Sequence, residues 1–251
     1  MLLVEHVTCG YSKEPIIKDI SFRVEEGECL SILGPNGCGK TTLLRGISGI
    51  LTPQGRVEIC GQNILSLSPR QKALQMAFMS QLSSLYFSYT VYETVMLGRY
   101  AHQKKGAFYT TSKEDKRIVE ESLRRTDMLK LKDRLITELS GGQLQRVFLA
   151  RVFAQEPQII LLDEPTNHLD LKYQVELMAA LKEWVKQGER CVVGVLHDVN
   201  LALDFADKVL LMEQGKVKAI EKVENLDLSL ISETYGMDVS GYMKSILKRW
   251  E

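Results

Sequence analysis

The feature that most constrains this chain is a glycine-rich stretch at residues 34–41, with the sequence G-P-N-G-C-G-K-T. It follows a short apolar run at 30–33 and precedes a helix-like segment at 42–47. A strand, such a loop and a helix in this order match the phosphate-binding loop, G-x-x-x-x-G-K-[ST]. The glycines let backbone N–H groups surround a polyphosphate, and the helix N-terminus adds a favourable dipole. A β–α turn that binds no ligand is the alternative, and the matching flanks favour a nucleotide site.

The loop predicts how a nucleotide and its metal ion would be held. The ammonium of Lys40 is expected to reach the β- and γ-phosphates, and the hydroxyl of Thr41 to bind Mg²⁺. An adenine needs a flat apolar surface for stacking, which Tyr11 could supply from the turn at 10–12. The residues expected to contact ATP are Tyr11, Gly34, Pro35, Asn36, Gly37, Cys38, Gly39, Lys40, Thr41 and Thr42.

Composition narrows the class of protein. The 251 residues are 45% apolar and 25% charged, which is typical of a soluble globular protein. The 32 basic residues balance 32 acidic ones, which argues against a nucleic-acid partner because such partners usually need a basic face. The start of the chain lacks the features of a secretory signal, and no apolar run of about 18 residues occurs. We therefore expect the chain not to span a membrane by itself.

The cysteines predict a reducing compartment. Their number is odd and none forms a C-x-x-C pair: Cys9, Cys29, Cys38, Cys60 and Cys191. Cys38 lies inside the phosphate loop, close to a helix N-terminus and to Lys40, and such surroundings lower the pKa of a thiol. We expect alkylation of Cys38 to block nucleotide binding and ATP to protect it.

An apolar strand at 159–163 ends in two carboxylates, Asp163 and Glu164. A strand without polar residues is expected at the centre of a parallel sheet, and its end would lie beside the phosphate loop. Asp163 suits the Mg²⁺ site and Glu164 suits the activation of water. Turns favour aspartate, so the pair alone is a weak signal; together with a phosphate loop it predicts catalysis.

Two further polar residues follow predicted strands. His197 comes after the strand at 191–196, where it could donate to the γ-phosphate and orient the attacking water. Gln81 follows the strand at 76–80, where α/β folds place ligand contacts. A lone histidine is more often structural and a lone glutamine is usually on the surface, so both predictions depend on the neighbouring motifs.

The segment from about 83 to 157 shows helical patterns and no convincing strand. Apolar residues at 91–99 share one helical face, and Ser112 with Asp115 has capping-box spacing before a helix to about residue 126. Ser140 with Gln143 has the same spacing at the start of another helix, so Ser140 could be only an N-cap. Glycines at 141 and 142 weaken that helix and expose backbone N–H groups, which favours an approaching anion. This segment is predicted to be a helical insertion into an α/β core.

The remaining chain is expected to form strands joined by turns and a polar helical tail. The strands are predicted at 2–8, 16–24 and 56–60, with a short helix after Ser68-Pro69 and a hairpin-like pair at 208–213 and 216–220.

Taken together, these residues resemble the ATP-binding subunit of ABC transporters over nearly the whole chain. Residues 139–143 (L-S-G-G-Q), followed by Gln145-Arg146, match the family signature and lie shortly before the strand at 159–163. The other family motifs are matched by Tyr11 (A-loop), Gln81 (Q-loop), residues 167–170 with Asp170 (D-loop) and His197 (H-loop).

The resemblance implies a single α/β ABC ATPase domain at 1–251. Its P-loop NTPase core would have a mixed, mainly parallel sheet with an antiparallel β subdomain at 1–82 and 158–251. A helical subdomain at 83–157 would carry the signature. It further implies a head-to-tail homodimer, in which the signature of one copy acts in trans on the ATP of the other.

The resemblance also assigns roles to single residues. Glu164 would be the catalytic base, assisted by His197 and Gln81. The Mg²⁺ ligands would be Thr41, Gln81 and Asp163. The residues that act in trans would be Ser140, Gly141, Gly142 and Gln143, and Asp170 would be the D-loop residue.

A narrower resemblance concerns the cargo. Residues 91–102 look like the V-x-x-x-V-x-x-G-R-x-P-H stretch of importers for iron-siderophores, haem and vitamin B12, with Ala101 in place of the usual proline. Residues 165–170 and 233–239 resemble the same subgroup. This implies transmembrane permease subunits, an indirect link to an extracytoplasmic substrate-binding protein, and a place on the cytoplasmic face of the membrane.

Two alternatives remain at this point. One is an importer ATPase for another small solute, and the other is a soluble ABC-type ATPase that acts on ribosomes or DNA. Proteins of the second kind usually carry two cassettes or a coiled-coil insertion, whereas this chain has one cassette and a compact helical segment.

Overall fold

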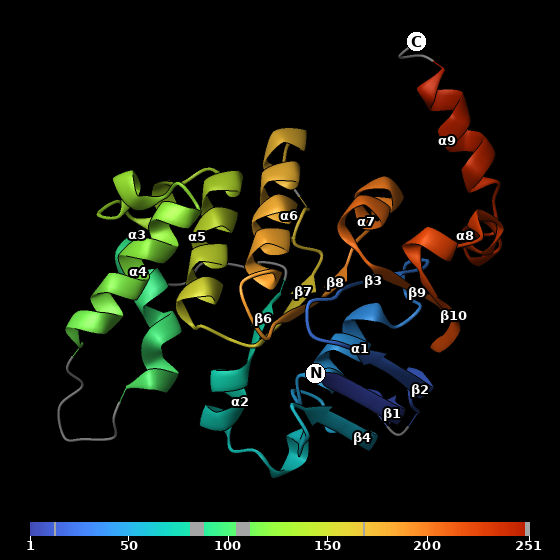
Figure 1. The fold of residues 1–251 in the computed structure, drawn as a ribbon, viewed down its shortest axis with the longest axis horizontal. Helices are drawn as coiled ribbons and strands as arrows, with labels where there is room; N and C mark the ends of the chain where they lie inside the picture. The colour runs from blue at the N-terminus through green and yellow to red at the C-terminus, as the bar shows by residue number, and fades with distance from the viewer. Residues whose placement is uncertain (13, 81–87, 104–110, 168, 249–251) are drawn as a thin grey trace.

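The computed structural model describes residues 1–12, 14–80, 88–103, 111–167 and 169–248, so Gln81 lies outside the described residues. A six-stranded sheet runs through the molecule in the order β10–β9–β3–β8–β7–β6 (Figure 1). All neighbours are parallel except β10 and β9. The bounds are β3 Cys29–Leu33, β6 Met76–Met79, β7 Ile159–Asp163, β8 Cys191–Val195, β9 Lys208–Glu213 and β10 Lys216–Lys222.

The central strands are apolar because both faces of the sheet are covered. Every residue of β3, β7 and β8 is buried, as expected for parallel strands between layers of helices. The structure confirms the strands predicted from the apolar runs, with ends that differ by one or two residues.

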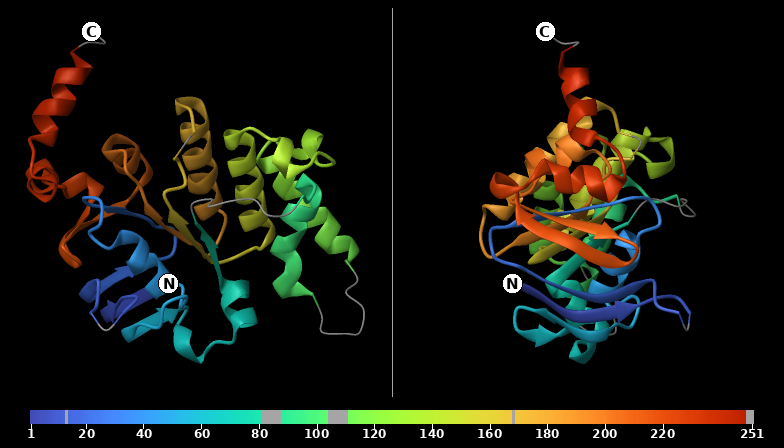
Figure 2. Two further views of the ribbon diagram at one scale, coloured as in Figure 1. Left: turned by 180° about the vertical axis from the view of Figure 1, so that it is seen from behind. Right: turned by 90° about the vertical axis from the view of Figure 1, so that its right-hand side faces the viewer.

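A second, antiparallel sheet has the order β2–β1–β4–β5. Its strands are β1 Leu2–Cys9, β2 Ile17–Val24, β4 Gln54–Ile59 and β5 Gln62–Asn63. Helix α1 (Lys40–Ile47) lies between the two sheets (Figure 2). Its buried side chains Leu43, Leu44 and Ile47 share one apolar cluster with residues of both sheets. The phosphate loop is therefore anchored at both ends, by β3 before it and by α1 after it.

The opposite face of the large sheet is covered by further helices. These are α6 Leu171–Val185, α7 Val199–Phe205 and α8 Leu228–Tyr235, which share a second apolar cluster with the sheet. The last helix, α9 (Val239–Leu247), extends away from the body of the molecule (Figure 1). No helix in the described part of the chain is long and apolar enough to cross a membrane.

The predicted helical segment has its own core. Its main elements are α3 Val91–Met96, the 3₁₀ helix η2 Leu97–His102, α4 Lys113–Arg125 and α5 Gly141–Ala154. Shorter ones are η3 Leu129–Leu131 and η4 Ile136–Glu138, while η1 Ile64–Ser66, α2 Pro69–Gln75 and η5 Val223–Asn225 lie elsewhere. Helix α5 belongs to two cores: Val147 and Ala150 face the helical cluster, whereas Leu149 and Phe153 face the sheet. It therefore joins the two parts of the chain, and the subdomain boundaries stay a prediction.

The helix predicted at 91–99 ends earlier than expected. It stops at Met96 and continues as 3₁₀ helix, because the backbone comes very close to α5 at Gly98, where an added Cβ would lie 2.4 Å from the Arg151 carbonyl oxygen. The next residue, Arg99, is 4% exposed. Its guanidinium donates to Asp115 Oδ1 at 2.9 Å, to the Ala154 carbonyl at 2.7 Å and to Glu156 Oε2 at 2.7 Å. Gly98 and Arg99 thus connect η2 with α4 and with the end of α5 through close packing and hydrogen bonds.

Candidate active site

Three neighbouring strands bring the predicted catalytic residues together. The phosphate loop follows β3, Asp163 and Glu164 lie at the end of β7, and His197 follows β8, which lies between the other two. Because these strands are parallel, their carboxyl ends meet at one edge of the sheet, where α/β folds bind ligands. The site is therefore placed by the topology of the sheet.

The phosphate loop requires glycine at its two ends. Gly34 has φ +153° and Gly39 has φ +107°, values that other residues rarely adopt. An added Cβ at Gly34 would lie 2.2 Å from the Met212 carbonyl oxygen, and one at Gly39 would lie 2.7 Å from Ile17 Cγ2. The loop is thus pressed against β9 on one side and β2 on the other.

Lys40 is held inside this loop. Its side chain is 6% exposed, and its ammonium donates to the carbonyl oxygens of Gly34 at 2.7 Å and Pro35 at 3.0 Å. Helix α1 begins without an acidic residue in its first turn, and Gly39 offers no side-chain cap. The first N–H groups of α1 are therefore open to an anion beside a buried ammonium.

Two of the three residues predicted to bind magnesium, Thr41 and Asp163, meet directly. The Thr41 hydroxyl donates to Asp163 Oδ1 at 2.9 Å. Burial raises the pKa of the Asp163 carboxyl, and the hydrogen bond from Thr41 opposes this shift. Oxygen ligands of this kind suit Mg²⁺, so the donor set fits the predicted ion.

Glu164 is clamped by two side chains. One carboxylate oxygen, Oε1, lies 2.6 Å from His197 Nε2, and the other, Oε2, accepts a hydrogen bond of 2.6 Å from the Asn167 amide. The backbone of Glu164 is in the left-handed region, with φ +55°. Such a conformation costs free energy in a residue with a side chain, and it aims this carboxylate at the edge of the sheet.

Two contacts near Glu164 are not predicted from the sequence. The motifs place Asn167 in the D-loop and give it no contact with the catalytic residues. A turn residue three positions after Glu164 is well placed to reach back to it, and that spacing is the signal that could have identified Asn167. Gln145, buried in α5, donates to the Pro165 carbonyl at 2.6 Å. The signature helix is thereby attached to the turn that follows Glu164.

Tyr11, predicted to stack on adenine, lies at the surface beside helix α1. It is 55% exposed. Its hydroxyl accepts a hydrogen bond of 2.7 Å from Arg45 on α1, and the guanidinium carbon of Arg45 lies 5.7 Å from the ring centroid. The ring is thus oriented by the helix that follows the phosphate loop.

The predicted pKa of Cys38 is wrong. The thiol is 6% exposed, and burial raises its pKa although Lys40 and nearby backbone N–H groups act in the opposite direction. Desolvation of the thiolate outweighs the positive surroundings, because the side chain points into the apolar cluster beneath the loop. Cys38 is a packing residue in this structure.

The signature residues stand apart from the phosphate loop of the same chain. Ser140 is the N-cap of α5: its backbone N–H donates to Gln143 Oε1 at 3.0 Å, and its hydroxyl accepts from the Gln143 N–H at 3.3 Å. No atom would contact an added Cβ at Gly141. Among the described residues, no hydrogen bond joins residues 140–143 to the phosphate loop. Asp170 is an N-cap as well, and it starts α6 by accepting from the Tyr173 N–H at 3.1 Å.

Comparisons with known proteins agree with this geometry. The family model described as ABC transporter matches residues 17–167. An uncharacterised ABC transporter ATP-binding protein of Bacillus subtilis, YvrA, is 40% identical over 88% of this chain, which spans only 50% of that relative. The ferric enterobactin transport ATP-binding protein FepC of Escherichia coli is 36% identical over 93% of the chain and 86% of its own length.

Two solved structures resemble the fold. An inward-facing putative metal-chelate type ABC transporter has a TM-score of 0.80 and 31% identity, covering 93% of this chain and 88% of that one. The ATP-binding cassette MJ0796, in a dimeric post-hydrolysis state bound to ADP and Pi, has a TM-score of 0.78 and 30% identity, covering 90% of this chain and all of that one.

Proposed function

The chain belongs to the ABC transporter family of ATP-binding proteins, whose activity is ATP hydrolysis, and from this premise we propose that it powers a membrane importer of iron–siderophore complexes, haem or cobalamin. The observation that supports the catalytic part is the meeting of Thr41 with Asp163 and of Glu164 with His197 at one sheet edge. The cargo is supported by the similarity to FepC and to a metal-chelate type transporter.

The proposed chemistry begins with the triphosphate. Its β- and γ-phosphates bind the N–H groups of the loop and the ammonium of Lys40, which exchanges its carbonyl partners for phosphate oxygens. Mg²⁺ would be held by Thr41, Asp163 and Gln81, and when bound it supplies neutralisation of the phosphate charge. Of these three residues the structure describes Thr41 and Asp163, and both offer oxygen atoms of the kind that Mg²⁺ prefers.

Glu164 then acts as the general base. A carboxylate has about four acceptor positions, so Glu164 can keep its contacts with His197 and Asn167 and still accept a hydrogen bond from water. It takes a proton from this water as the water attacks the γ-phosphorus. His197 keeps the carboxylate in place and lies beside the position of the γ-phosphate.

The other half of each ATP site comes from a second copy of the chain. The start of α5 combines Ser140, exposed backbone N–H groups and two glycines, which suits it to bind a γ-phosphate. This γ-phosphate would not be that of the ATP at the phosphate loop of the same chain. We propose a head-to-tail homodimer in which residues 140–143 contact the ATP of the partner. The dimeric state of a related cassette supports this arrangement.

A groove on the helical part is the proposed docking surface for permease subunits. It is lined by side chains of α3 and η2, with a cavity volume of about 300 Å³, and Leu97 at its edge is 48% exposed. Arg99, two residues later, connects this groove to the far end of α5. Permease contact would place the chain on the cytoplasmic face of the membrane, with an extracytoplasmic substrate-binding protein as an indirect partner.

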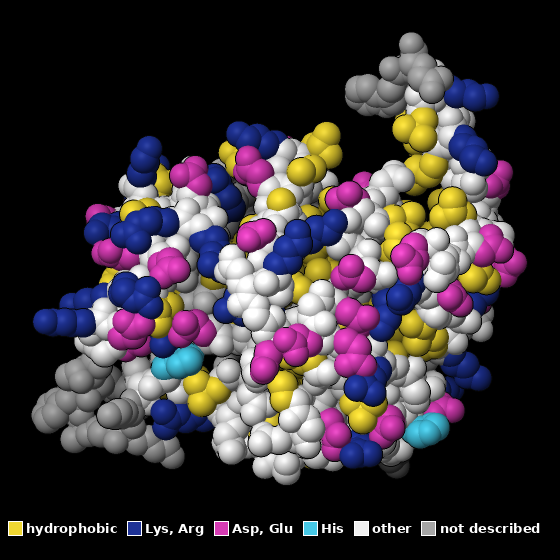
Figure 3. All heavy atoms as spheres, viewed as in Figure 1, with side chains coloured by type: hydrophobic (Ala, Val, Ile, Leu, Met, Phe, Trp, Pro, Cys, Tyr) yellow, Lys and Arg dark blue, Asp and Glu magenta, His cyan; other side chains and the backbone are white. Residues whose placement is uncertain are grey.

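The face seen in Figure 3 favours this function over action on nucleic acid. Lysine and arginine side chains alternate with aspartate and glutamate over the face seen in Figure 3, and the formal net charge is zero. A nucleic-acid partner would be bound by a continuous basic surface.

The test is a membrane pull-down with the tagged Glu164→Gln variant and ATP, with the Lys40→Ala variant as the control that should not retain nucleotide. A polytopic permease that co-purifies with Glu164→Gln and not with Lys40→Ala is the expected result. Recovery of ribosomal or DNA-bound material in its place would contradict the transport function.

A further inference from the structure

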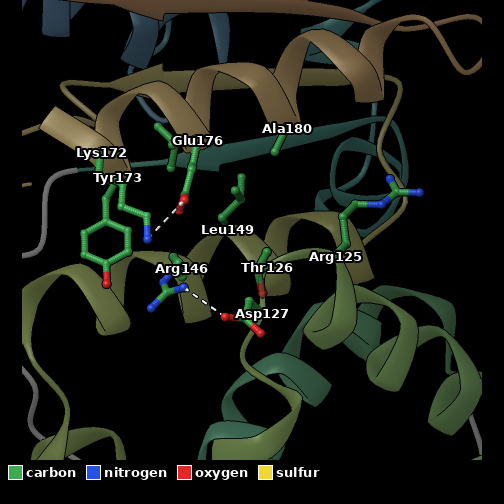
Figure 4. A pocket seen from close by; sticks show the side chains of 10 residues that line it. Arg125, Thr126, Asp127, Arg146, Leu149, Lys172, Tyr173, Glu176 and Ala180 are labelled. Carbon is green, nitrogen blue, oxygen red and sulfur yellow. Dashed lines mark ion pairs between the residues drawn. The ribbon is translucent and has the colours of Figure 1, made fainter.

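The start of α6 and the signature helix α5 meet through one aromatic side chain. Tyr173 lies in the first turn of α6, three residues after the D-loop Asp170. Its ring faces the guanidinium of Arg146 on α5, with the guanidinium carbon 4.6 Å from the ring centroid. Figure 4 shows these two side chains reaching toward each other from facing helices. The distance and geometry are those of a cation–π contact.

Tyr173 also packs on the signature itself. An added Cβ at Gly142 would lie 3.3 Å from Tyr173 Cδ2 and 3.6 Å from Leu169 Cδ2. Gly142 is thus covered by one side chain of the D-loop, Leu169, and by Tyr173, which follows it. Because the Tyr173 N–H is capped by Asp170 at 3.1 Å, the same residue contacts both motifs within one chain.

A cavity separates α5 from α6 over part of their length, so contacts at its two ends hold α5 in position. A cavity of about 320 Å³ lies between α5 and α6 (Figure 4). Beyond it the helices meet again, where Phe153 stacks on Trp184 with ring centroids 6.3 Å apart. Tyr173 therefore supports the signature end of α5, while the aromatic pair supports the other end.

The other favourable contacts of the Arg146 guanidinium are weak. Its Nη1 atom lies 3.7 Å from Oδ2 of Asp127, whose side chain is 88% exposed, and ion pairs of this kind contribute little to stability. The Nε atom of Arg146 is buried and has no hydrogen-bond partner in the described part of the chain. The ring of Tyr173 is therefore the close favourable neighbour of this guanidinium.

We propose that Tyr173 is a positioning residue that fixes the signature of each chain relative to its own D-loop. The two motifs then meet the second copy of the chain as one rigid surface, and ATP binding between the copies does not have to order them first. The inference rests on the head-to-tail dimer of the proposed function.

The test compares dimerisation with nucleotide binding in the Glu164→Gln background, where ATP is not consumed. Tyr173→Leu removes the ring, Tyr173→Phe keeps it, and Tyr242→Leu is a matched control at an exposed tyrosine of α9. ATP-dependent dimerisation is measured by analytical ultracentrifugation, and the binding of a fluorescent ATP analogue is measured on dilute monomer.

We expect Tyr173→Leu to weaken dimerisation about tenfold, because without the cation–π contact each copy must order its signature against its own D-loop when the dimer forms. Its monomer should bind the analogue as the parent does, and both Tyr173→Phe and Tyr242→Leu should dimerise normally. Normal dimerisation of Tyr173→Leu would overturn the inference. Equal loss of analogue binding by its monomer would also overturn it, because the effect would then be a general loss of structure.

A double-mutant cycle provides a second measurement. If Arg146→Met and Tyr173→Leu act through the same contact, the double variant should dimerise no more weakly than the worse single variant. Additive effects would contradict the contact. A parent that binds ATP but does not dimerise would remove the head-to-tail function itself, and the positioning role with it.

Discussion

The two halves of the proposed ATP site differ in how complete they are within one chain. In the phosphate-loop half (residues 34–42, 163–164 and 197), side chains at the carboxyl ends of the central strands already contact each other, as in the pairs Thr41–Asp163 and Glu164–His197. In the signature half (residues 140–143), the hydrogen bonds of Ser140 to other described residues all lie within its own helix start. One half is assembled by folding, and the other is a prepared surface whose ligand must come with a second copy.

The two halves of the ATP site are positioned in different ways. The groups of the phosphate-loop half are placed by the ends of parallel strands, where α/β folds bind ligands. The signature half is positioned by packing of α5 against the core, through Gln145, Arg146 and Phe153. Changes in the first half should therefore act on chemistry, and changes in the second half on assembly.

The largest expected effect separates chemistry from binding. Glu164→Gln should lower kcat for ATP hydrolysis by about 10³-fold, because general bases contribute roughly 10²–10⁴-fold. ATP affinity should be unchanged, since phosphate contacts come from the loop. Steady-state hydrolysis and equilibrium binding measure the two quantities, with the exposed Glu176→Gln on α6 as the control. An unchanged kcat would remove Glu164 from the catalytic group.

The next effect separates assembly from stability. Gly141→Asp should reduce hydrolysis by about 100-fold or more, because the new carboxylate faces the partner's phosphates and like charges repel by several kcal/mol. The position is open in the free chain, and an acidic residue suits a helix N-terminus, so thermal stability should not fall. Calorimetry and analogue binding by the monomer check this. Hydrolysis at the normal rate would place the signature away from the nucleotide.

A smaller effect concerns the orientation of the base. Asn167→Ala removes the donor to Glu164 Oε2, and a hydrogen bond to a charged group is worth about 1.5–3 kcal/mol. We expect kcat to fall roughly tenfold with little change in KM. Asn167→Asp would repel the carboxylate and should be worse than alanine. Equal activity of the wild type, Asn167→Ala and Asn167→Asp would show that His197 alone positions Glu164.

The smallest effect tests the environment of the loop cysteine. Because burial raises the pKa of Cys38, the fraction of thiolate at pH 8 is lower than for an ordinary cysteine, and rises only as the pH increases toward that pKa. Cys60 also has a raised pKa, but it is exposed. Iodoacetamide should therefore label Cys60 before Cys38, as peptide mapping over time can show. Faster labelling of Cys38, with protection by ATP, would restore the original expectation.

Much of the phosphate-loop half could be predicted from sequence. Apolar runs predict buried parallel strands, and the residues that follow such strands lie together at the edge of the sheet where the strands end. The contact of Asn167 with Glu164 does not follow from the strands, and the three-residue spacing between the two residues is its only signal in the sequence. The left-handed backbone at Glu164 has no such signal. The raised pKa of Cys38 also could not be predicted, since the thiol is desolvated by residues from distant parts of the chain.

The signature half was recognised by a motif, and its surroundings were not predictable. Capping-box spacing correctly placed the start of α5 at Ser140. The cover of Gly142 by Tyr173, and the early end of the helix at Met96, arise from close approach between helices far apart in sequence. Such approaches depend on three-dimensional packing, which periodicity within one helix does not report.

The central claim is that each ATP site combines the two halves from different copies. It is tested most directly by mixing two inactive proteins, Lys40→Ala and Gly141→Asp, and measuring ATP hydrolysis. In a mixed dimer one site has both intact halves, so random pairing should restore about a quarter of the wild-type rate. If both halves served the same chain, no combination would contain an intact site, and the mixture would stay as inactive as its components.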